Sequence, residues 1–215
     1  MGNDIVDLNT PWAVNKSRNA RFMAKVFTED ETQAIGQSGN PDAMLWALWA
    51  AKETAYKVTA KSIPDALSSP LKYRVKLVRG EAANTENTQT GTVTTQSGIV
   101  TVCVFFHENH VHCIGINGNH RDTGKLYHGY GCGESECEDC PSLSPAARES
   151  LAARKLALKH IAQCCGRNIE DMEIRKNGED RETGPPMLYF KGKKDKIDIS
   201  LSHDGRYVAY AFLPQ

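Results

Sequence analysis

The sequence lacks any long hydrophobic run and any surplus of one charge. No stretch of its 215 residues approaches the roughly 18 apolar residues of a membrane-spanning helix, so we expect no membrane contact. Lysine plus arginine and aspartate plus glutamate number 26 each, which argues against a nucleic-acid partner. The opening residues, MGNDIVDL, have no basic segment followed by an apolar one, so we expect a cytoplasmic protein without a secretory signal.

Two helix starts are visible in the first third of the chain. Thr28 and Glu31 have the spacing of a capping box, which predicts a short helix beginning there. Asn40 as N-cap, with Pro41 at the first helical position, predicts a second helix over about 41–61. This second helix has no internal glycine or proline after its first position.

The next stretch is rich in β-branched residues. Residues 71–78 alternate between apolar and basic, which predicts a half-exposed strand, and the polar residues 80–91 predict a loop. Residues 92–116 predict two or three antiparallel strands. Three histidines on or near these strands are interpreted as surface residues: His107, His110 and His112.

A stretch almost without aliphatic residues divides the remaining chain. Residues 117–143 are rich in glycine, serine, histidine and cysteine, which predicts a linker. A helix follows, beginning at Ser144-Pro145 and ending before Gly166. Residues 197–212 predict a hairpin, because Asp-Gly at 204–205 is typical of a tight turn.

The order of these elements predicts an α+β fold in two halves, residues 1–116 and 144–215. Each half would hold a small antiparallel sheet packed on helices. The length is sufficient for one large domain or two small ones. The seven cysteines are interpreted as thiols or metal ligands, because disulfides are rare in the cytoplasm.

The predicted helix over 41–61 carries three charges within WAAKETAYK. On a helical wheel Lys52 falls within the apolar face, whereas Glu53 and Lys57 form an i,i+4 pair beside it. That pair is either an ordinary surface ion pair or part of a functional site. Lys52 either extends its ammonium to solvent or has an anionic partner.

Two further segments carry reactive side chains. Asp4 and Asp7 lie in an N-terminal segment that is apolar enough to be a strand, although a solvated terminus is the alternative. Ser202 and His203 precede the predicted hairpin turn, and turn chemistry alone would explain residues of these types.

Together these three segments resemble the 4′-phosphopantetheinyl transferase superfamily. They are Gly2-Asn3-Asp4, then Trp49-Ala-Ala-Lys52-Glu53-Thr-Ala-Tyr56-Lys57, then Ser200-Leu-Ser202-His203-Asp204-Gly205. The resemblance covers about residues 1–78 and 144–212 and leaves out the linker.

The order of the motifs matters for the implied fold. The small holo-acyl-carrier-protein synthases have this order in one short chain and assemble as trimers. The larger, surfactin-type transferases are pseudo-dimers of two tandem halves in the reverse order. This chain has the larger length with the first order, so the resemblance implies a monomeric, circularly permuted pseudo-dimer with 117–143 as the new connection.

The resemblance implies an enzyme that transfers the phosphopantetheine arm of coenzyme A to a serine of an apo acyl or peptidyl carrier protein, releasing 3′,5′-ADP. Asp4 and Glu53 would bind Mg²⁺, and Glu53 is also a candidate general base. The third acid of the surfactin-type motif is replaced by Val6, and Asp7 is a weaker candidate. Lys57 would contact the pyrophosphate.

The other motif residues are implied to bind coenzyme A. Lys52 would contact the coenzyme or the metal-site carboxylates, and Ser202 and His203 would bind the coenzyme from the second half. Pro185 stands where the family has a lysine near the adenine. Arg154 on the second long helix is interpreted as part of a solvated face, with a place in the coenzyme cleft as the alternative.

The linker offers a second candidate metal site. Four soft ligands for a structural Zn²⁺ lie within it, although a polar loop without metal is the favoured interpretation. They are His128, Cys132, Cys137 and Cys140. The alternative function is therefore a non-catalytic module on the same fold, which binds zinc or a carrier protein.

Overall fold

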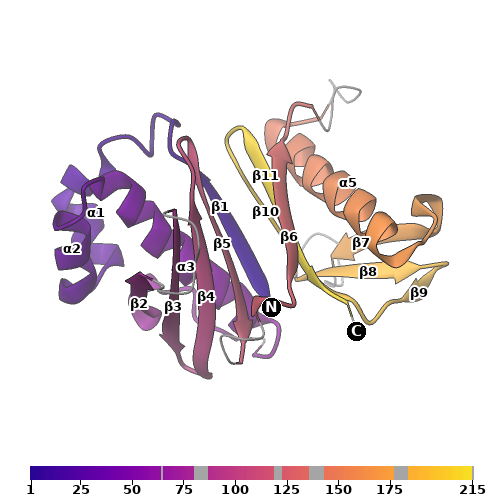
Figure 1. Ribbon diagram of the computed structural model, residues 1–215, viewed down its shortest axis with the longest axis horizontal. Coiled ribbons are helices and arrows are strands. Elements are labelled where there is room, and N and C mark those ends of the chain that lie inside the picture. The colour runs from indigo at the N-terminus through magenta and orange to yellow at the C-terminus, as the bar shows by residue number, and fades with distance from the viewer. Residues whose placement is uncertain (64, 80–86, 119–122, 136–142, 177–183, 215) are drawn as a thin grey trace.

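The fold is mixed α+β, as predicted. The computed structural model describes residues 1–63, 65–79, 87–118, 123–135, 143–176 and 184–214. These residues form four α-helices and three antiparallel sheets (Figure 1). Within the described part of the chain, no helix has the length and apolar character needed to cross a membrane.

The first part of the chain is a five-stranded sheet with a long helix across one face. The strand order is β1-β5-β4-β3-β2, and every neighbouring pair is antiparallel. The long helix, α3, packs mainly on β1 and β5 (Figure 1). The elements are β1 Gly2–Asp7, α1 Ala20–Val26, α2 Glu29–Gly36, α3 Pro41–Ala60, β2 Arg74–Arg79, β3 Thr88–Thr95, β4 Gly98–Phe106 and β5 His110–Asn117.

The predicted helix starts are confirmed by their capping hydrogen bonds. The Thr28 hydroxyl accepts from the Glu31 N–H, and the Glu31 carboxylate accepts from the Thr28 N–H. The Asn40 side chain accepts from the Ala43 N–H, so α3 begins at Pro41. The predicted strand at 71–78 begins later, because residues 70–72 form a 3₁₀ turn.

Helix α1 was not predicted from the sequence. Its N-cap is Asn19, whose side chain accepts from the Phe22 N–H. The helix has only seven residues and no acidic residue in its first turn, so it carries few of the local signals of a helix start. Burial of Met23 and Val26 in the core supports it instead.

The second part of the chain packs one long helix on a three-stranded sheet. That sheet has the order β10-β11-β6, and a second sheet has the order β7-β8-β9. The Ser144 cap, the Gly166 terminus and the hairpin at 204–205 are all confirmed. The elements are β6 Tyr127–Cys132, α5 Pro145–Cys165, β7 Met172–Lys176, β8 Pro186–Phe190, β9 Lys193–Lys194, β10 Asp198–Asp204 and β11 Tyr207–Leu213.

Strand β6 corrects the prediction that 117–143 is only a linker. It pairs with β11 along its whole length, with Tyr127 opposite Phe212 and Cys132 opposite Tyr207. The strand was not predicted, because it contains two glycines and glycine is uncommon in strands. A Cβ on Gly129 would lie 2.7 Å from the Tyr210 hydroxyl, so glycine allows the Tyr210 ring to lie against this strand.

The two parts meet along a seam between β1 and β10. These strands lie side by side, and β5 is the next strand after β1 in one sheet, as β11 is after β10 in the other (Figure 1). The Asn3 N–H donates to Ser200 Oγ at 3.0 Å, and Asn3 Nδ2 donates to Ser202 Oγ at 2.9 Å. The same seam also buries a small apolar cluster that includes Met1, Ile114 and Ala211. The start of the chain is therefore held against its last hairpin.

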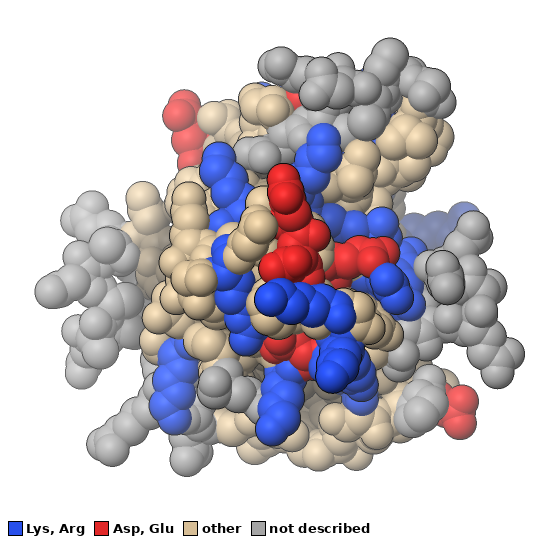
Figure 2. Space-filling view, turned by 90° about the vertical axis from the view of Figure 1, so that its right-hand side faces the viewer, with Lys and Arg blue, Asp and Glu red and all other residues tan. Residues whose placement is uncertain are grey.

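The outer face of the second part is charged but not uniformly basic. Figure 2 shows lysine and arginine side chains around a smaller group of acidic ones on this face. Ion pairs join Arg167 to Asp195 and Arg175 to Glu173. Pairs of this kind are typical of a solvated surface.

Candidate active site

Gly2 allows β1 to lie directly on α3. A Cβ at this position would lie 2.5 Å from the Thr54 carbonyl oxygen and 3.1 Å from Val58 Cγ2, so no larger residue fits without a shift of the strand. This close approach places the next side chain on the same face, Asp4, beside Lys57 in the last turn of α3. The glycine of the first motif is therefore a packing requirement of the site.

Asp4 and Lys57 form an ion pair at the edge of the seam. Lys57 Nζ lies 2.8 Å from Asp4 Oδ1 and 2.9 Å from the Asn3 carbonyl oxygen. The Asp4 side chain is 13% exposed and that of Lys57 is 29% exposed. Burial raises the pKa of the Asp4 carboxyl above its ordinary value, and the ammonium of Lys57 offsets only part of this effect. Lys57 is therefore partly exposed to solvent, and its ammonium does not fully offset the cost of burying the Asp4 charge.

Glu53 brings a second carboxylate to the same place. It lies one turn before Lys57 on α3. Burial raises the pKa of its carboxyl, the charge of Asp4 raises it further, and Lys57 acts in the opposite direction. Asp4 and Glu53 are thus two mutually repelling carboxylates beside a single ammonium, and such a pair would be stabilised by a further cation.

The donor set suits a hard divalent cation. Mg²⁺ is commonly held by one or two carboxylates, and waters and substrate phosphates complete its shell. Asp4 and Glu53 supply two such carboxylates. Among the described residues no group of three histidine, cysteine, aspartate or glutamate side chains could hold a metal by itself. Asp4 and Glu53 would therefore hold such an ion only together with waters or substrate phosphates.

Neither Val6 nor Asp7 adds a third acid. Val6 is fully buried in the core of the first part. The Asp7 carboxylate accepts two hydrogen bonds from the Arg206 guanidinium, each 2.8 Å long, and a third from the Arg206 N–H. Asp7 thus holds the β10–β11 turn on β1, and the interpretation of Asp7 as a weaker metal ligand is wrong.

His203 approaches this group from the second part of the chain. Its charge acts on the pKa of Asp4, after burial and Lys57. Its Nδ1 lies 2.8 Å from Glu149 Oε2 on α5, and its side chain is 36% exposed. The sequence did not single out Glu149, because it lies 54 residues before its partner.

A cleft of about 730 Å³ opens between α3, α5 and β10. Lys57 and Lys61 line it from α3, Arg154 from α5, Lys176 from β7 and His203 from β10. The charged side chains among these described lining residues are thus all basic. Arg154 lies in the cleft lining, as in the alternative considered from the sequence. Gly184 and Pro185 also line the cleft.

Comparison with known protein families identifies the first part of the chain. Residues 1–114 match the family model of the 4′-phosphopantetheinyl transferase superfamily. The chain belongs to this superfamily. The matched residues include Asp4, Glu53 and Lys57, whereas Ser202 and His203 lie beyond the match. A search of the curated proteins found no match.

Lys52 lies in the core and not in the cleft. Its ammonium lies 2.9 Å from the Glu31 carboxylate and donates to the carbonyl oxygens of Pro70 and Tyr73. The Lys52 side chain is 1% exposed. Of the two alternatives left open by the sequence, solvent or an anionic partner, Lys52 has the anionic partner, and it is Glu31. The assignment of Lys52 to coenzyme binding is therefore wrong.

Ser202 also departs from the prediction. It is 4% exposed, and its hydroxyl accepts from the Asn3 amide across the seam. It does not line the cleft, unlike Ser200, Leu201 and His203. Ser202 therefore joins β10 to β1, and its predicted role as a coenzyme ligand is wrong.

The predicted zinc ligands of this transferase superfamily member do not form a described site. Cys137 and Cys140 lie outside the described residues. His128 and Cys132 lie at opposite ends of β6, about 13 Å apart along a strand, which is too far for both to bind one zinc ion. The His128 ring stacks on Phe105, with the ring centres 4.8 Å apart.

The three histidines near β5 are not surface residues as a group. His110 and His112 are 4% and 1% exposed, while His107 is exposed. The rings of His107 and His110 stack with centres 4.2 Å apart, and Tyr130 and Tyr207 cover His110 from the second part. The interpretation of His110 and His112 as surface residues is wrong, because β6 and β11 cover that face of the first sheet.

Proposed function

We propose that the protein transfers the 4′-phosphopantetheine arm of coenzyme A to a serine of an apo acyl or peptidyl carrier protein, in a Mg²⁺-dependent reaction that releases 3′,5′-ADP. Membership of the superfamily supports phosphopantetheine transfer in general. One observation carries the more specific proposal. Lys57 pairs with Asp4, acts on the pKa of Glu53, and lines a cleft whose charged side chains are basic and could accept the phosphates of coenzyme A.

The reaction requires a serine hydroxyl to attack a phosphorus atom whose oxygens repel it. Positioning and charge neutralisation supply most of the catalysis in such transfers. Lys57 would donate from Nζ to a phosphate oxygen and stabilise charge on the leaving group. Arg154 and His203 would bind phosphates further along the cleft.

Glu53 is the candidate general base of the transfer. A carboxylate whose pKa is raised holds a proton more tightly, so it accepts the proton of the attacking serine more readily than an ordinary glutamate. Asp4 and Glu53 would together hold Mg²⁺, and the ion would supply neutralisation of the phosphate charge when bound.

The circularly permuted, pseudo-dimeric arrangement is part of the same proposal. Two features support it: each part of the chain packs one long helix on an antiparallel sheet, and the cleft lies between α3 of the first part and α5 of the second. We therefore propose that the enzyme acts as a monomer, with both walls of its cleft in one chain.

Mass spectrometry of a carrier protein tests the proposed function. The protein is incubated with coenzyme A, Mg²⁺ and a panel of apo acyl, peptidyl and aryl carrier proteins. We expect a mass gain of one phosphopantetheine arm on at least one carrier, and its loss when the metal is chelated. No gain on any carrier would contradict the proposal.

Two glutamine variants provide the matched control. Glu53→Gln removes the candidate base and metal ligand, and we expect it to abolish the mass gain. Glu170→Gln removes the same charge from an exposed position in the second part, and we expect full transfer. A non-catalytic binding module would give no mass gain with either variant or with the parent chain.

A further inference from the structure

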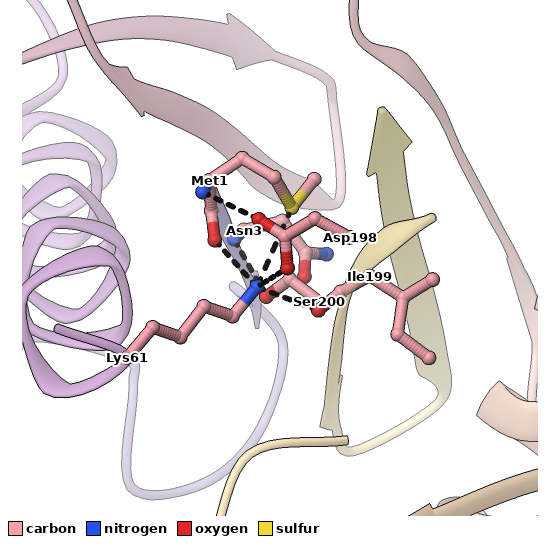
Figure 3. Close-up of polar contacts among 6 residues, drawn as sticks. All are labelled: Met1, Asn3, Lys61, Asp198, Ile199 and Ser200. Atoms are coloured by element: carbon pink, nitrogen blue, oxygen red, sulfur yellow. Dashed lines mark hydrogen bonds and ion pairs between the residues drawn. The ribbon is translucent and has the colours of Figure 1, made fainter. Parts of the chain in front are cut away.

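Lys61 connects three elements at the base of the cleft. It is the C-cap residue of α3, and its side chain extends to the points where β1 and β10 begin (Figure 3). Its Nζ lies 2.8 Å from the Met1 carbonyl oxygen, 2.6 Å from Asp198 Oδ1 and 2.7 Å from the Ile199 carbonyl oxygen. One ammonium thus joins the helix to both strands of the seam.

This ammonium has no donor left for a substrate. A lysine ammonium has three N–H groups, and these three oxygens accept all of them. The side chain of Lys61 is 16% exposed. Burial alone would raise the pKa of Asp198, but the ammonium groups of Lys61 and Met1 hold it below its ordinary value. Asp198 is therefore a charged, fixed partner of Lys61.

The three joined elements carry the candidate catalytic residues and one candidate ligand of coenzyme A. Helix α3 carries Glu53 and Lys57, β1 carries Asp4, and β10 carries His203. Close to Lys61, the hydrogen bond from Asn3 to Ser200 holds β1 on β10 (Figure 3). A shift at this junction would move the two walls of the cleft relative to each other.

We propose that Lys61 is a positioning residue of the transfer site, which aligns α3 and β1 with β10 through Asp198. Lys61 acts through the placement of other residues and does not itself bind coenzyme A. This inference rests on the proposed function, because it assigns Lys61 a role in that reaction. It goes beyond that function, since neither the motifs nor the family match identify Lys61.

Steady-state kinetics of Lys61→Met and Asp198→Asn tests this role. Methionine keeps the length of the lysine side chain but removes its charge and donors, while asparagine keeps the shape of the aspartate. We expect each variant to raise the KM for coenzyme A about tenfold, because a misplacement of about 1 Å can cost up to about a hundredfold. The KM for the carrier protein should change far less.

The double variant separates a shared contact from two independent effects. If Lys61 acts through Asp198, Lys61→Met with Asp198→Asn raises the KM for coenzyme A no further than the stronger single variant. Lys25→Met is the matched control, because Lys25 is exposed on α1 and lies outside the site. We expect its kinetics to equal those of the parent chain.

Two results would overturn the inference. One is a lower melting temperature of Lys61→Met with an unchanged KM for coenzyme A, which would mean that Lys61 stabilises the fold and nothing more. The other is additive effects in the double variant. The parent chain in the same assay reports on the proposed function itself: if it transfers nothing, that function fails before any variant is compared.

Discussion

Helix α3 carries two lysine–carboxylate pairs that differ in their surroundings. Lys52 and Glu31 lie within the first part of the chain, at 2.9 Å, and Lys57 and Asp4 lie at the seam, at 2.8 Å. The Lys52 side chain is 1% exposed, whereas that of Lys57 is 29% exposed. Residue types and distances are nearly the same, so they do not distinguish the two roles.

The difference lies in the number of partners. Lys52 donates to three acceptors, and Glu31 also accepts from the N–H groups of Thr28 and Val75. The inner pair, Lys52 and Glu31, thus has these partners within the first part of the chain. At the seam, by contrast, Lys57 pairs with Asp4, lowers the pKa that burial and Asp4 raise in Glu53, and lines a cleft. A pair whose donors and acceptors are all used within the core indicates a structural role. A pair with an additional carboxylate nearby, beside a cleft, indicates a functional role.

Breaking the inner pair should have the largest effect on stability. Lys52→Met leaves the buried Glu31 carboxylate without its counter-charge, and we expect a loss of about 3–5 kcal/mol in the free energy of unfolding. Denaturant titration measures it. Adding Glu31→Gln to this variant should recover part of the loss, because the unpaired charge is removed. A loss below about 1 kcal/mol, typical of surface pairs, would contradict the comparison.

Breaking the seam pair, Lys57 and Asp4, should instead affect the reaction. We expect Lys57→Met to lower kcat/KM for transfer about a hundredfold, which is typical of removing one group that stabilises developing charge. Its stability should fall far less than that of Lys52→Met, since the Lys57 side chain is 29% exposed. Parallel carrier-modification assays and denaturant titrations measure the two effects. Equal stability losses in the two variants would erase the distinction.

A change at Gly2 should disturb the seam pair without altering its charges. Gly2→Ala places a Cβ 2.5 Å from the Thr54 carbonyl oxygen, so β1 must shift, and we expect a loss of about 1–3 kcal/mol together with lower activity. The matched control is Gly36→Ala in α2, where a Cβ meets nothing within 4 Å. We expect the control to be as stable as the parent chain or more stable. Thermal denaturation compares them.

The buried histidines should make the seam sensitive to acid. Burial, and then the charge of His107, lower the pKa of His110 to about 4, so the unfolded chain binds a proton there more readily than the folded one. Its contribution to stability is present above pH 6.5, the ordinary pKa, and is lost as the pH falls toward 4. The slope is at most about 1.4 kcal/mol per pH unit. Urea titrations of His110→Phe should show a flatter pH dependence, and an unchanged slope would contradict this origin.

Removing one carboxylate from the seam should have the smallest effect on stability, and a favourable one. The pKa of Glu53 is raised, so ionised Glu53 costs stability above its folded pKa, and this cost disappears as the pH falls toward the ordinary value of 4.5. We expect Glu53→Gln to raise the melting temperature slightly at pH 8 and to abolish transfer. A lower melting temperature would show that Glu53 is a structural residue like Glu31.

The sequence by itself determined what depends on near neighbours. The capping residues Thr28 and Asn40 and the turn at 204–205 act through hydrogen bonds and backbone conformations within a few residues, so their elements were predictable. The i,i+4 spacing of Glu53 and Lys57 likewise placed both on one stripe of α3. The motifs around Asp4 and His203 then indicated which stripe was chemically important.

Only the tertiary structure decided the partners that are distant in sequence. Glu31 lies 21 residues before Lys52, and Asn3 lies 199 residues before Ser202. Strand β6 forms because it pairs with the edge of β11, and the contacts of Lys61 depend on the two strands that begin beside it. Which polar groups satisfy one another in a buried region follows from how the sheets pack, because a buried charge or donor without a partner costs free energy. That packing is why two of the motif residues, Lys52 and Ser202, stabilise the fold, while Lys57 pairs with Asp4 and lines the cleft.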